Sequence, residues 1–187
     1  PQGYFHFLIA CFQLSMAGLF FSASFFTLFL FWELVGILSY LLVQFWYKKP
    51  DAAGSALRVI LINKTGDFFL ISGIGLLVSF GLQFPVSVNM VFPEGAEIFL
   101  ASPTGQVLCL FLLLSALVKS AQFPFSVWLK RAMAGPASVS ALLHSATMVV
   151  AGVWLMSRLA PFMPEPVMKF LTISGVLSLL AGNLAAF

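Results

Sequence analysis

The longest nearly uncharged stretch of the chain is its beginning, where Glu33 is the only acidic or basic side chain before Lys48 apart from His6. A helix needs about 20 mostly apolar residues to cross the hydrocarbon core of a bilayer, so this stretch has room for two crossings. The whole chain is 61% hydrophobic and 8% charged, whereas soluble proteins average about 25% charged residues. So few charges cannot cover a surface that faces water, and we predict a multi-pass integral membrane protein.

Polar or proline-containing breaks divide the chain into about six predicted membrane-spanning helices. The breaks end the helices because proline cannot continue one and polar clusters favour turns. The predicted spans cover residues 4–21, 25–47, 54–80, 104–133, 137–159 and 167–187. Residues 81–103 are predicted to form a loop. The expected fold is therefore an all-α polytopic helical bundle that forms a single transmembrane domain over residues 1–187.

Other features of the sequence narrow the class of protein further. The chain begins with Pro1 and ends at Phe187 inside an apolar run, so we expect it to be a fragment of a longer protein. The net charge is +3, but the basic residues are scattered, which argues against nucleic-acid binding. Cys11 and Cys109 lie far apart without a CxxC partner, so iron–sulfur and zinc sites are not expected.

The informative residues are the charged ones that fall inside the predicted spans. A charge at the bilayer centre costs about 2.5–3.5 kcal/mol on insertion scales, and such residues usually mark ion or proton pathways. Glu33 is either a protonatable relay or a carboxylic acid hydrogen-bonded in a helix interface. Lys64 and Asp67 are three residues apart, so they share one helical face and can pair. This pair either modulates proton transfer or simply neutralises charge.

Lys119 follows an uncharged run and stands shortly before Pro124. Proline lacks an amide proton and crowds the carbonyl four residues earlier, here that of Ser120, so the helix should break just after Lys119. Irregular backbone at membrane depth is tolerated only inside protein or beside a water-filled cavity. A buried lysine there can exchange protons near neutral pH. The alternative is that Lys119 serves as a fixed counter-ion of Glu33.

His144 lies in the fifth predicted span, and the unperturbed pKa of histidine is close to physiological pH. We interpret it as a relay group after Lys119, with a hydrogen-bonded interface histidine as the alternative. Haem ligation together with His6 is a weaker hypothesis, because His6 falls at the margin of its span. No phosphate loop, nucleophile elbow or metal-ligand cluster is found in the sequence, so we expect no covalent chemistry from this chain by itself.

Four motifs in the same order resemble one known family. They are FWELVGILSYLL at residues 31–42, NKTGD at 63–67, KSAQFPFSVWL at 119–129 and AMAGPASVSALLHSATMV at 132–149. They are similar to the antiporter-like membrane subunits of respiratory complex I, in particular the large chain-5-type (L-type) subunit.

The resemblance implies a bundle with two inverted five-helix repeats, of which this chain would hold most of the first. It also implies proton translocation driven by quinone reduction elsewhere in the complex. Glu33, Lys119 and His144 would form the proton relay, with Lys64 and Asp67 as a modulating pair. NADH, quinone, FMN and iron–sulfur clusters would be bound by other subunits. This chain would hold no cofactor or metal and would contact other membrane subunits and lipid.

The chain departs from the family pattern at three places. Lys130 and Arg131 stand where the family usually has an acid, which puts any role of that acid in doubt. Ala137-Ser138 replaces the usual Thr-Pro. Lys64 replaces the commoner Arg, which keeps the charge but loses the bidentate fork.

Several functions stay open at the level of the sequence. The leading hypothesis is a proton-pumping subunit of an NADH–quinone oxidoreductase in a bacterial plasma membrane or an organellar inner or thylakoid membrane. The nearest alternatives are the large subunit of a multi-subunit sodium/proton antiporter and a subunit of a membrane-bound hydrogenase. A structural membrane subunit without transport is the alternative from a different class.

Overall fold

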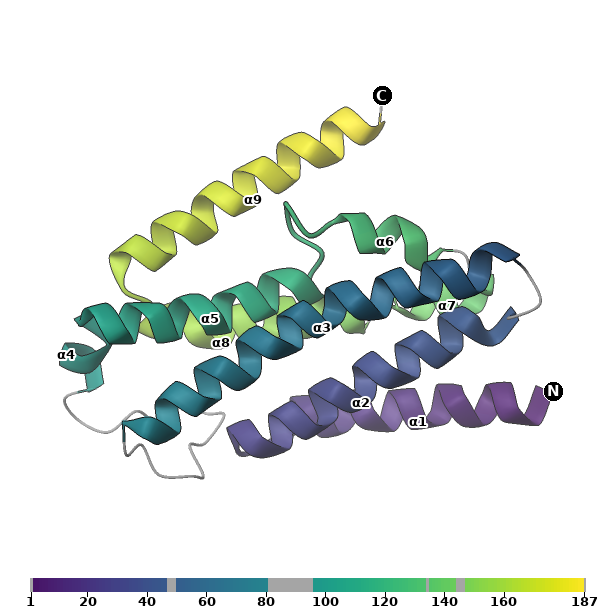
Figure 1. Ribbon diagram of the computed structural model, residues 1–187, viewed down its shortest axis with the longest axis horizontal. Helices are drawn as coiled ribbons and strands as arrows, with labels where there is room; N and C mark the ends of the chain where they lie inside the picture. Colours follow the sequence, from purple (N-terminus) through teal and green to yellow (C-terminus); the bar gives the residue numbers. More distant parts are fainter. Residues whose placement is uncertain (1, 47–49, 81–95, 134, 144–146, 187) are drawn as a thin grey trace.

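A computed structural model describes residues 2–46, 50–80, 96–133, 135–143 and 147–186, and every regular element within them is a helix (Figure 1). The longer helices are α1 (Gln2–Phe20), α2 (Phe25–Val43), α3 (Pro50–Ser79), α5 (Pro103–Lys119) and α9 (Glu165–Ala186). The shorter elements are η1 (Gln44–Trp46), α4 (Ala96–Ala101), α6 (Val127–Ala132), α7 (Ala137–Ala141), α8 (Met148–Leu159) and η3 (Ala160–Phe162).

Six helical segments are apolar enough to belong in a membrane. Four of them are also long enough to cross it, namely Gln2–Phe20, Phe25–Val43, Ala53–Ser79 and Glu165–Leu184. Two shorter apolar helices, Pro103–Lys119 and Met148–Phe162, occupy the predicted fourth and fifth spans. Large apolar side chains such as Phe26, Phe68 and Leu179 are exposed on the outside of the bundle, as is expected where lipid replaces water. The predicted all-α membrane bundle is confirmed.

Several of the predicted boundaries differ from the structure. Helix α3 begins at Pro50 and not at residue 54, where the third span was predicted to start, since proline fits the first turn of a helix. The predicted loop at 81–103 contains the helix α4, whose residues are mostly good helix formers. The predicted second span to residue 47 is too long, since α2 ends at Val43 and the tighter η1 follows. The predicted fifth span is divided into α7 and α8. Thr147 at this division has non-helical dihedrals, φ −134° and ψ −83°, and its hydroxyl donates to the Leu142 carbonyl at 2.6 Å.

The turn between α1 and α2 lies where the sequence predicts it. The Ser24 hydroxyl accepts a hydrogen bond from the Thr27 amide, and the Thr27 hydroxyl accepts one from the Ser24 amide, each at 3.2 Å. This reciprocal capping box satisfies two amides that the first turn of a helix leaves unpaired. The short polar step therefore ends one membrane helix and starts the next.

Helix α3 occupies the middle of the bundle, packed against α2 on one side and α5 on the other (Figure 1). Gly66 and Gly73 permit the close approach of α5, since a Cβ atom on either would lie 2.9 Å from the Val118 side chain or 2.8 Å from the Leu112 side chain, respectively. These two glycines therefore allow α3 and α5 to pack closely, whereas a Cβ atom added at Gly75 would meet nothing within 4 Å.

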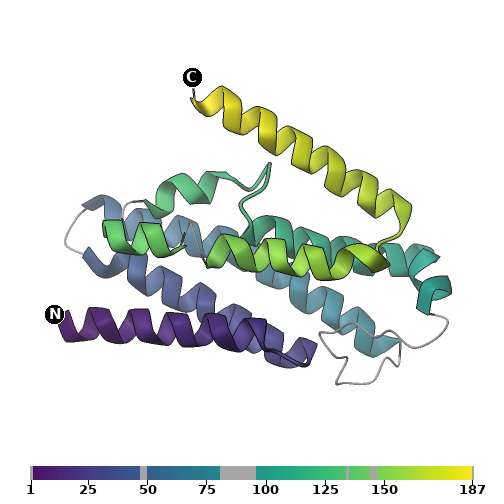
Figure 2. The ribbon, with the colours of Figure 1, turned by 180° about the vertical axis from the view of Figure 1, so that it is seen from behind.

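Helix α8 packs against α5 and lies in front of it in Figure 2, where α9 slants away from the rest of the bundle. Most of α9 is exposed on the surface of this chain. A hydrogen bond of 2.8 Å from the Phe123 amide to the Ser178 hydroxyl joins α9 to the segment that follows α5. The buried centre of the structure is therefore formed by α2, α3, α5 and α8.

Candidate functional site

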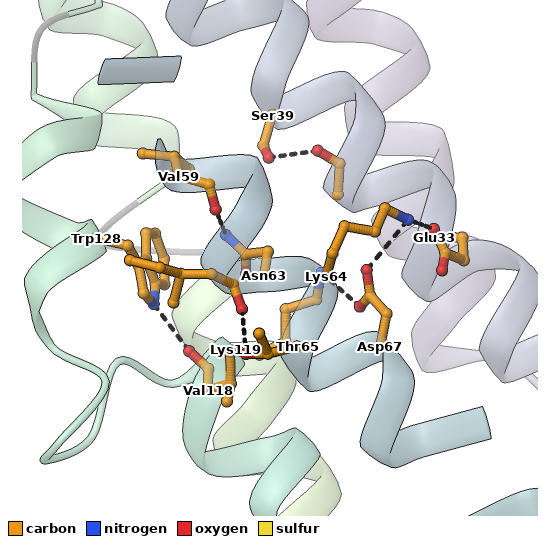
Figure 3. Close-up of polar contacts among 12 residues, drawn as sticks. Glu33, Ser39, Val59, Asn63, Lys64, Thr65, Asp67, Val118, Lys119 and Trp128 are labelled. Atoms are coloured by element: carbon orange, nitrogen blue, oxygen red, sulfur yellow. Dashed lines mark hydrogen bonds and ion pairs between the residues drawn. The ribbon is translucent and has the colours of Figure 1, made fainter. Parts of the chain in front are cut away.

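Three helices bring charged side chains together at the centre of the bundle (Figure 3). Glu33 comes from α2, Lys64 and Asp67 come from successive turns of α3, and Lys119 is the last residue of α5. The prediction that Lys64 and Asp67 pair on one helical face is confirmed, with 3.3 Å between Lys64 Nζ and Asp67 Oδ2. Four of the five predicted site residues thus form one cluster.

The four charges alternate in sign along the cluster. Lys64 Nζ donates a hydrogen bond to Glu33 Oε2, and the same ammonium group faces Asp67 Oδ2. Lys119 Nζ lies 3.5 Å from the other oxygen, Asp67 Oδ1. Asp67 therefore stands between two cations, each near one of its oxygens. The alternation makes the cluster neutral as a whole, which lowers the free energy of holding charges away from water.

Burial increases along the cluster in one direction. The side chains of Lys64 and Glu33 are 42% and 23% exposed on the surface of this chain, whereas those of Asp67 and Lys119 are 4% and 0% exposed. The cluster therefore leads from a partly open pair of charges to an amine that is fully enclosed by protein.

The amine of Lys119 faces a carboxylate and an aromatic ring. Within the described part of the chain, neither Lys119 Nζ nor the Asp67 oxygens make a hydrogen bond, although the two groups are close enough for a strong electrostatic attraction. The amine lies over the face of the Trp32 indole ring, with 5.4 Å between Nζ and the ring centroid. Gly36 provides the space beside it, since a Cβ atom there would lie 3.2 Å from Nζ.

The predicted helix break directly after Lys119 is confirmed, and backbone hydrogen bonds explain how α5 ends. The Gln122 amide donates to the Leu117 carbonyl at 3.0 Å, and the Ala121 amide donates to the Val118 carbonyl at 3.2 Å. This is the Schellman pattern, and it requires a left-handed residue, which is Ala121 with φ 53°. In this pattern, carbonyl groups that the end of a helix would leave unpaired accept hydrogen bonds.

Trp128 of α6 joins the helix after the break to the last turn of α5 by a hydrogen bond. Its buried indole Nε1 donates to the Val118 carbonyl at 2.8 Å, one residue before Lys119. The two pieces α5 and α6 run in the same general direction, with the connecting segment displaced to one side (Figure 1). The break therefore leaves Lys119 at a helix end, where carbonyl oxygens carry partial negative charge that favours a cation.

The remaining site predictions have different outcomes. His144 lies outside the described residues, so its role as a relay stays a prediction. The alternative that Lys119 directly neutralises Glu33 does not match the contacts, because Lys119 faces Asp67 and Lys64 faces Glu33. The sequence interpretation missed Trp32 and Gly36. Their spacing of four residues on α2, one turn of a helix, was the signal that they share a face.

Metal binding finds no support in the described part of the chain, where no three His, Cys, Asp or Glu side chains are grouped closely enough to hold an ion. Lys130 and Arg131, which replace the usual acid of the family, are exposed in the last turn of α6. Neither takes part in an ion pair with a described residue.

Comparison with known proteins places these features in a family. Residues 22–187 match the family described as NADH:quinone oxidoreductase/Mrp antiporter, TM. The chain is 41% identical over 197 residues to the chloroplastic NAD(P)H-quinone oxidoreductase subunit 5 of Populus trichocarpa, which covers 100% of this chain and 26% of that protein. It is 43% identical over 191 residues to the counterpart from Lemna minor, covering 97% and 25%. The chain thus spans about a quarter of the length of these relatives.

Two solved structures share the fold. The Mrp complex from Dietzia sp. DQ12-45-1b superimposes with a TM-score of 0.77 at 30% identity, covering 88% of this chain and 18% of the matched chain. The membrane-bound sulfane sulfur reductase, an archaeal respiratory membrane complex, gives 0.73 at 22% identity, covering 89% and 34%. The second likeness concerns the fold alone. The resemblance that the sequence motifs indicated is confirmed.

Proposed function

The chain belongs to the NADH:quinone oxidoreductase/Mrp antiporter transmembrane family, and from this membership we propose that it is part of a proton-translocating membrane subunit of an NAD(P)H–quinone oxidoreductase. The observation that carries the proposal is the chain of alternating charges from Glu33 to the enclosed amine of Lys119. Charged groups at this depth cost free energy, and for that reason they usually mark pathways of ions or protons.

The geometry supports a specific order of events. Asp67 has two oxygens, and each faces a different cation, Lys64 at 3.3 Å and Lys119 at 3.5 Å. When Lys64 stays with Glu33, Asp67 is available to stabilise a protonated Lys119. When Lys64 leaves Glu33 and neutralises Asp67, the ammonium of Lys119 loses its counter-charge and releases its proton. His144 is the predicted acceptor.

The source of the driving force lies outside this chain in the proposal. Quinone reduction in other subunits would shift Lys64 between its two carboxylate partners, and NADH, FMN, iron–sulfur clusters and quinone would be bound there. The partners are other membrane subunits and the surrounding lipid, in a bacterial plasma membrane or an organellar inner or thylakoid membrane.

A second candidate is the large subunit of a multi-subunit sodium/proton antiporter. The likeness to the Mrp complex at 30% identity favours it. The same charge cluster would then couple proton movement to a sodium gradient in place of quinone reduction. A purely structural membrane subunit is disfavoured, because Lys119 and Asp67 would be buried charges without a purpose.

The test measures acidification of inverted membrane vesicles that carry the full-length protein in its complex. Wild type is compared with Lys119→Ala, and with Lys169→Ala as the control, since Lys169 forms an exposed ion pair with Glu165 on α9. Each is driven once by NADH and once by a sodium gradient. Acidification by NADH that Lys119→Ala abolishes and Lys169→Ala retains supports the proposal. A response to sodium alone would favour the antiporter, and a normal Lys119→Ala would refute the role of this lysine.

A further inference from the structure

One face of α2 lies against the amine of Lys119, through two residues that have no role in the proposed function so far. Trp32 and Gly36 are four residues apart on this helix, so they lie one above the other on the same face. The Trp32 ring centroid is 5.4 Å from Lys119 Nζ, and a Cβ atom on Gly36 would be 3.2 Å from it. Both residues are buried, with Trp32 0% exposed. Glu33, the neighbour of Trp32, points instead toward Lys64 (Figure 3).

The Trp32 ring distinguishes the two protonation states of the amine. A tryptophan face carries negative electrostatic potential, which attracts an ammonium group within about 6 Å and does so more strongly where water is excluded. A neutral amine has no net charge for the ring to attract. Since Lys119 is fully buried, the ring stabilises its protonated state.

Gly36 determines how close the amine can come to α2. An added methyl group there would have only Lys119 Nζ at 3.2 Å and Asp67 Oδ2 at 3.9 Å within 4 Å. A methyl group at that place would push the amine away from the ring and its carboxylate. It would meet no backbone, so the packing of α2 itself would stay intact.

The carboxylate of Asp67 does not orient the amine by itself. The two groups are 3.5 Å apart, and neither forms a hydrogen bond within the described part of the chain. The surfaces around Lys119 Nζ therefore contribute to its position together with the ion pair, and α2 supplies two of them at Trp32 and Gly36.

We propose that Trp32 and Gly36 form a seat for the protonated amine of Lys119 and are positioning residues for proton transfer. The inference rests on the proposed function and adds two residues to it. Trp32 stabilises the ammonium, and Gly36 lets it reach the ring and Asp67 together.

The helices that pack around Lys119 carry other charged groups. Asp67 and Lys64 of α3 and Glu33 of α2 interact electrostatically with the amine of Lys119. Helices α8 and α9 also pack against α5, and their basic residues Arg158 and Lys169 are exposed near helix ends. The tests below leave all of these groups unchanged.

The first test records the rate of proton translocation against pH in inverted vesicles that carry the full-length protein in its complex. Trp32→Leu should move the alkaline limb of the profile to lower pH by about one unit, because the ammonium loses the ring. Trp32→Phe keeps an aromatic face and should show a smaller shift. Trp154→Leu is the matched control, since Trp154 lies 5.5 Å from Arg158 on α8, and its alkaline limb should coincide with that of wild type.

The second test adds the methyl group at Gly36. Gly36→Ala should lower the translocation rate about tenfold while the complex assembles in normal amount, because a displaced reacting group slows transfer steeply. Gly75→Ala is the control, as its new Cβ would meet nothing within 4 Å, and its rate should equal that of wild type.

The outcomes separate this inference from the proposed function. Wild-type vesicles that do not translocate protons would overturn the proposed function and the seat together. Translocating wild-type vesicles with an unmoved alkaline limb in Trp32→Leu would overturn the seat alone, including the case of a uniform loss of rate at every pH. If Trp32→Leu fails to assemble, the limb of Trp32→Phe decides in the same way.

Discussion

Two ion pairs of the same chemical type lie side by side in this protein and differ in their surroundings. The outer pair is Glu33 with Lys64, and the inner pair is Asp67 with Lys119. The side chains of the outer pair are 23% and 42% exposed, whereas those of the inner pair are 4% and 0% exposed. The outer pair is joined by a hydrogen bond, and the inner pair is not.

This arrangement is the reverse of what stability alone would favour. Charges that protein encloses need good geometry and full hydrogen bonding to offset their desolvation. The loosely held pair is nevertheless the one that is enclosed. In the proposed function the inner pair is therefore the one that changes its protonation state, and the position of Lys64 between Glu33 and Asp67 controls the counter-charge that Lys119 faces.

The largest expected effect comes from breaking the inner pair. Asp67→Asn leaves the ammonium of Lys119 buried without a counter-charge, and removal of one partner of a buried pair typically costs about 3–5 kcal/mol. Proton translocation should fall to the background level of the vesicles. The measurements are the free energy of unfolding in detergent and the rate of acidification.

A double variant, Asp67→Asn with Lys119→Met, separates the unpaired charge from the lost carboxylate. It should regain most of the stability and none of the translocation, since both charges are then absent. An equal loss of stability in the single and double variants would contradict the interpretation that the buried cation is the cause.

Breaking the outer pair should have a smaller effect on stability. Glu33→Gln removes a carboxylate that protein encloses less than it encloses Asp67, so the loss in the free energy of unfolding should be smaller than for Asp67→Asn. Lys64 is then free to neutralise Asp67, and translocation should slow several-fold. The same two measurements apply, and a loss of stability as large as that of Asp67→Asn would remove the contrast between the pairs.

The helix break can be loosened without touching a charge. Trp128→Phe removes the indole donor to the Val118 carbonyl, and a lost hydrogen bond of this kind costs about 1 kcal/mol. The amides of Ala121 and Gln122 should then exchange hydrogen faster, which mass spectrometry of the segment after Lys119 can detect. Unchanged exchange would show that the Schellman bonds alone hold the break.

The smallest effect is expected at the substituted position of the outer pair. Lys64→Arg restores the residue that the family more commonly has, and its planar fork can bond Glu33 in two places. The positive charge and its ion pair with Glu33 are both kept, so the change in the free energy of unfolding should be smaller than that of Glu33→Gln. Translocation should match wild type within a factor of about two. A complete loss would show that the compact ammonium of lysine is itself required.

Whether a feature could be predicted from the sequence depended on how far apart in the chain the interacting residues lie. The pairing of Lys64 with Asp67 depends on helical spacing within one segment, and the break after Lys119 depends on the local chain up to Pro124, so both were predictable. The partner of Lys119 was not, because three helices had to be placed first. The seat at Trp32 and Gly36 was missed for the same reason, since a tryptophan and a glycine in an apolar helix are usually read as packing residues.

The sequence by itself determined that this chain is a bundle of membrane helices with charges at bilayer depth, since composition and the distance between polar breaks leave no other solvent for it. It also determined the family through its ordered motifs. Only the tertiary structure decided that Asp67 stands between two cations and that Lys119 rests on the face of Trp32. Contacts between helices depend on crossing angles and on where glycines such as Gly66 allow close approach, and these are properties of the packed bundle that no single segment carries.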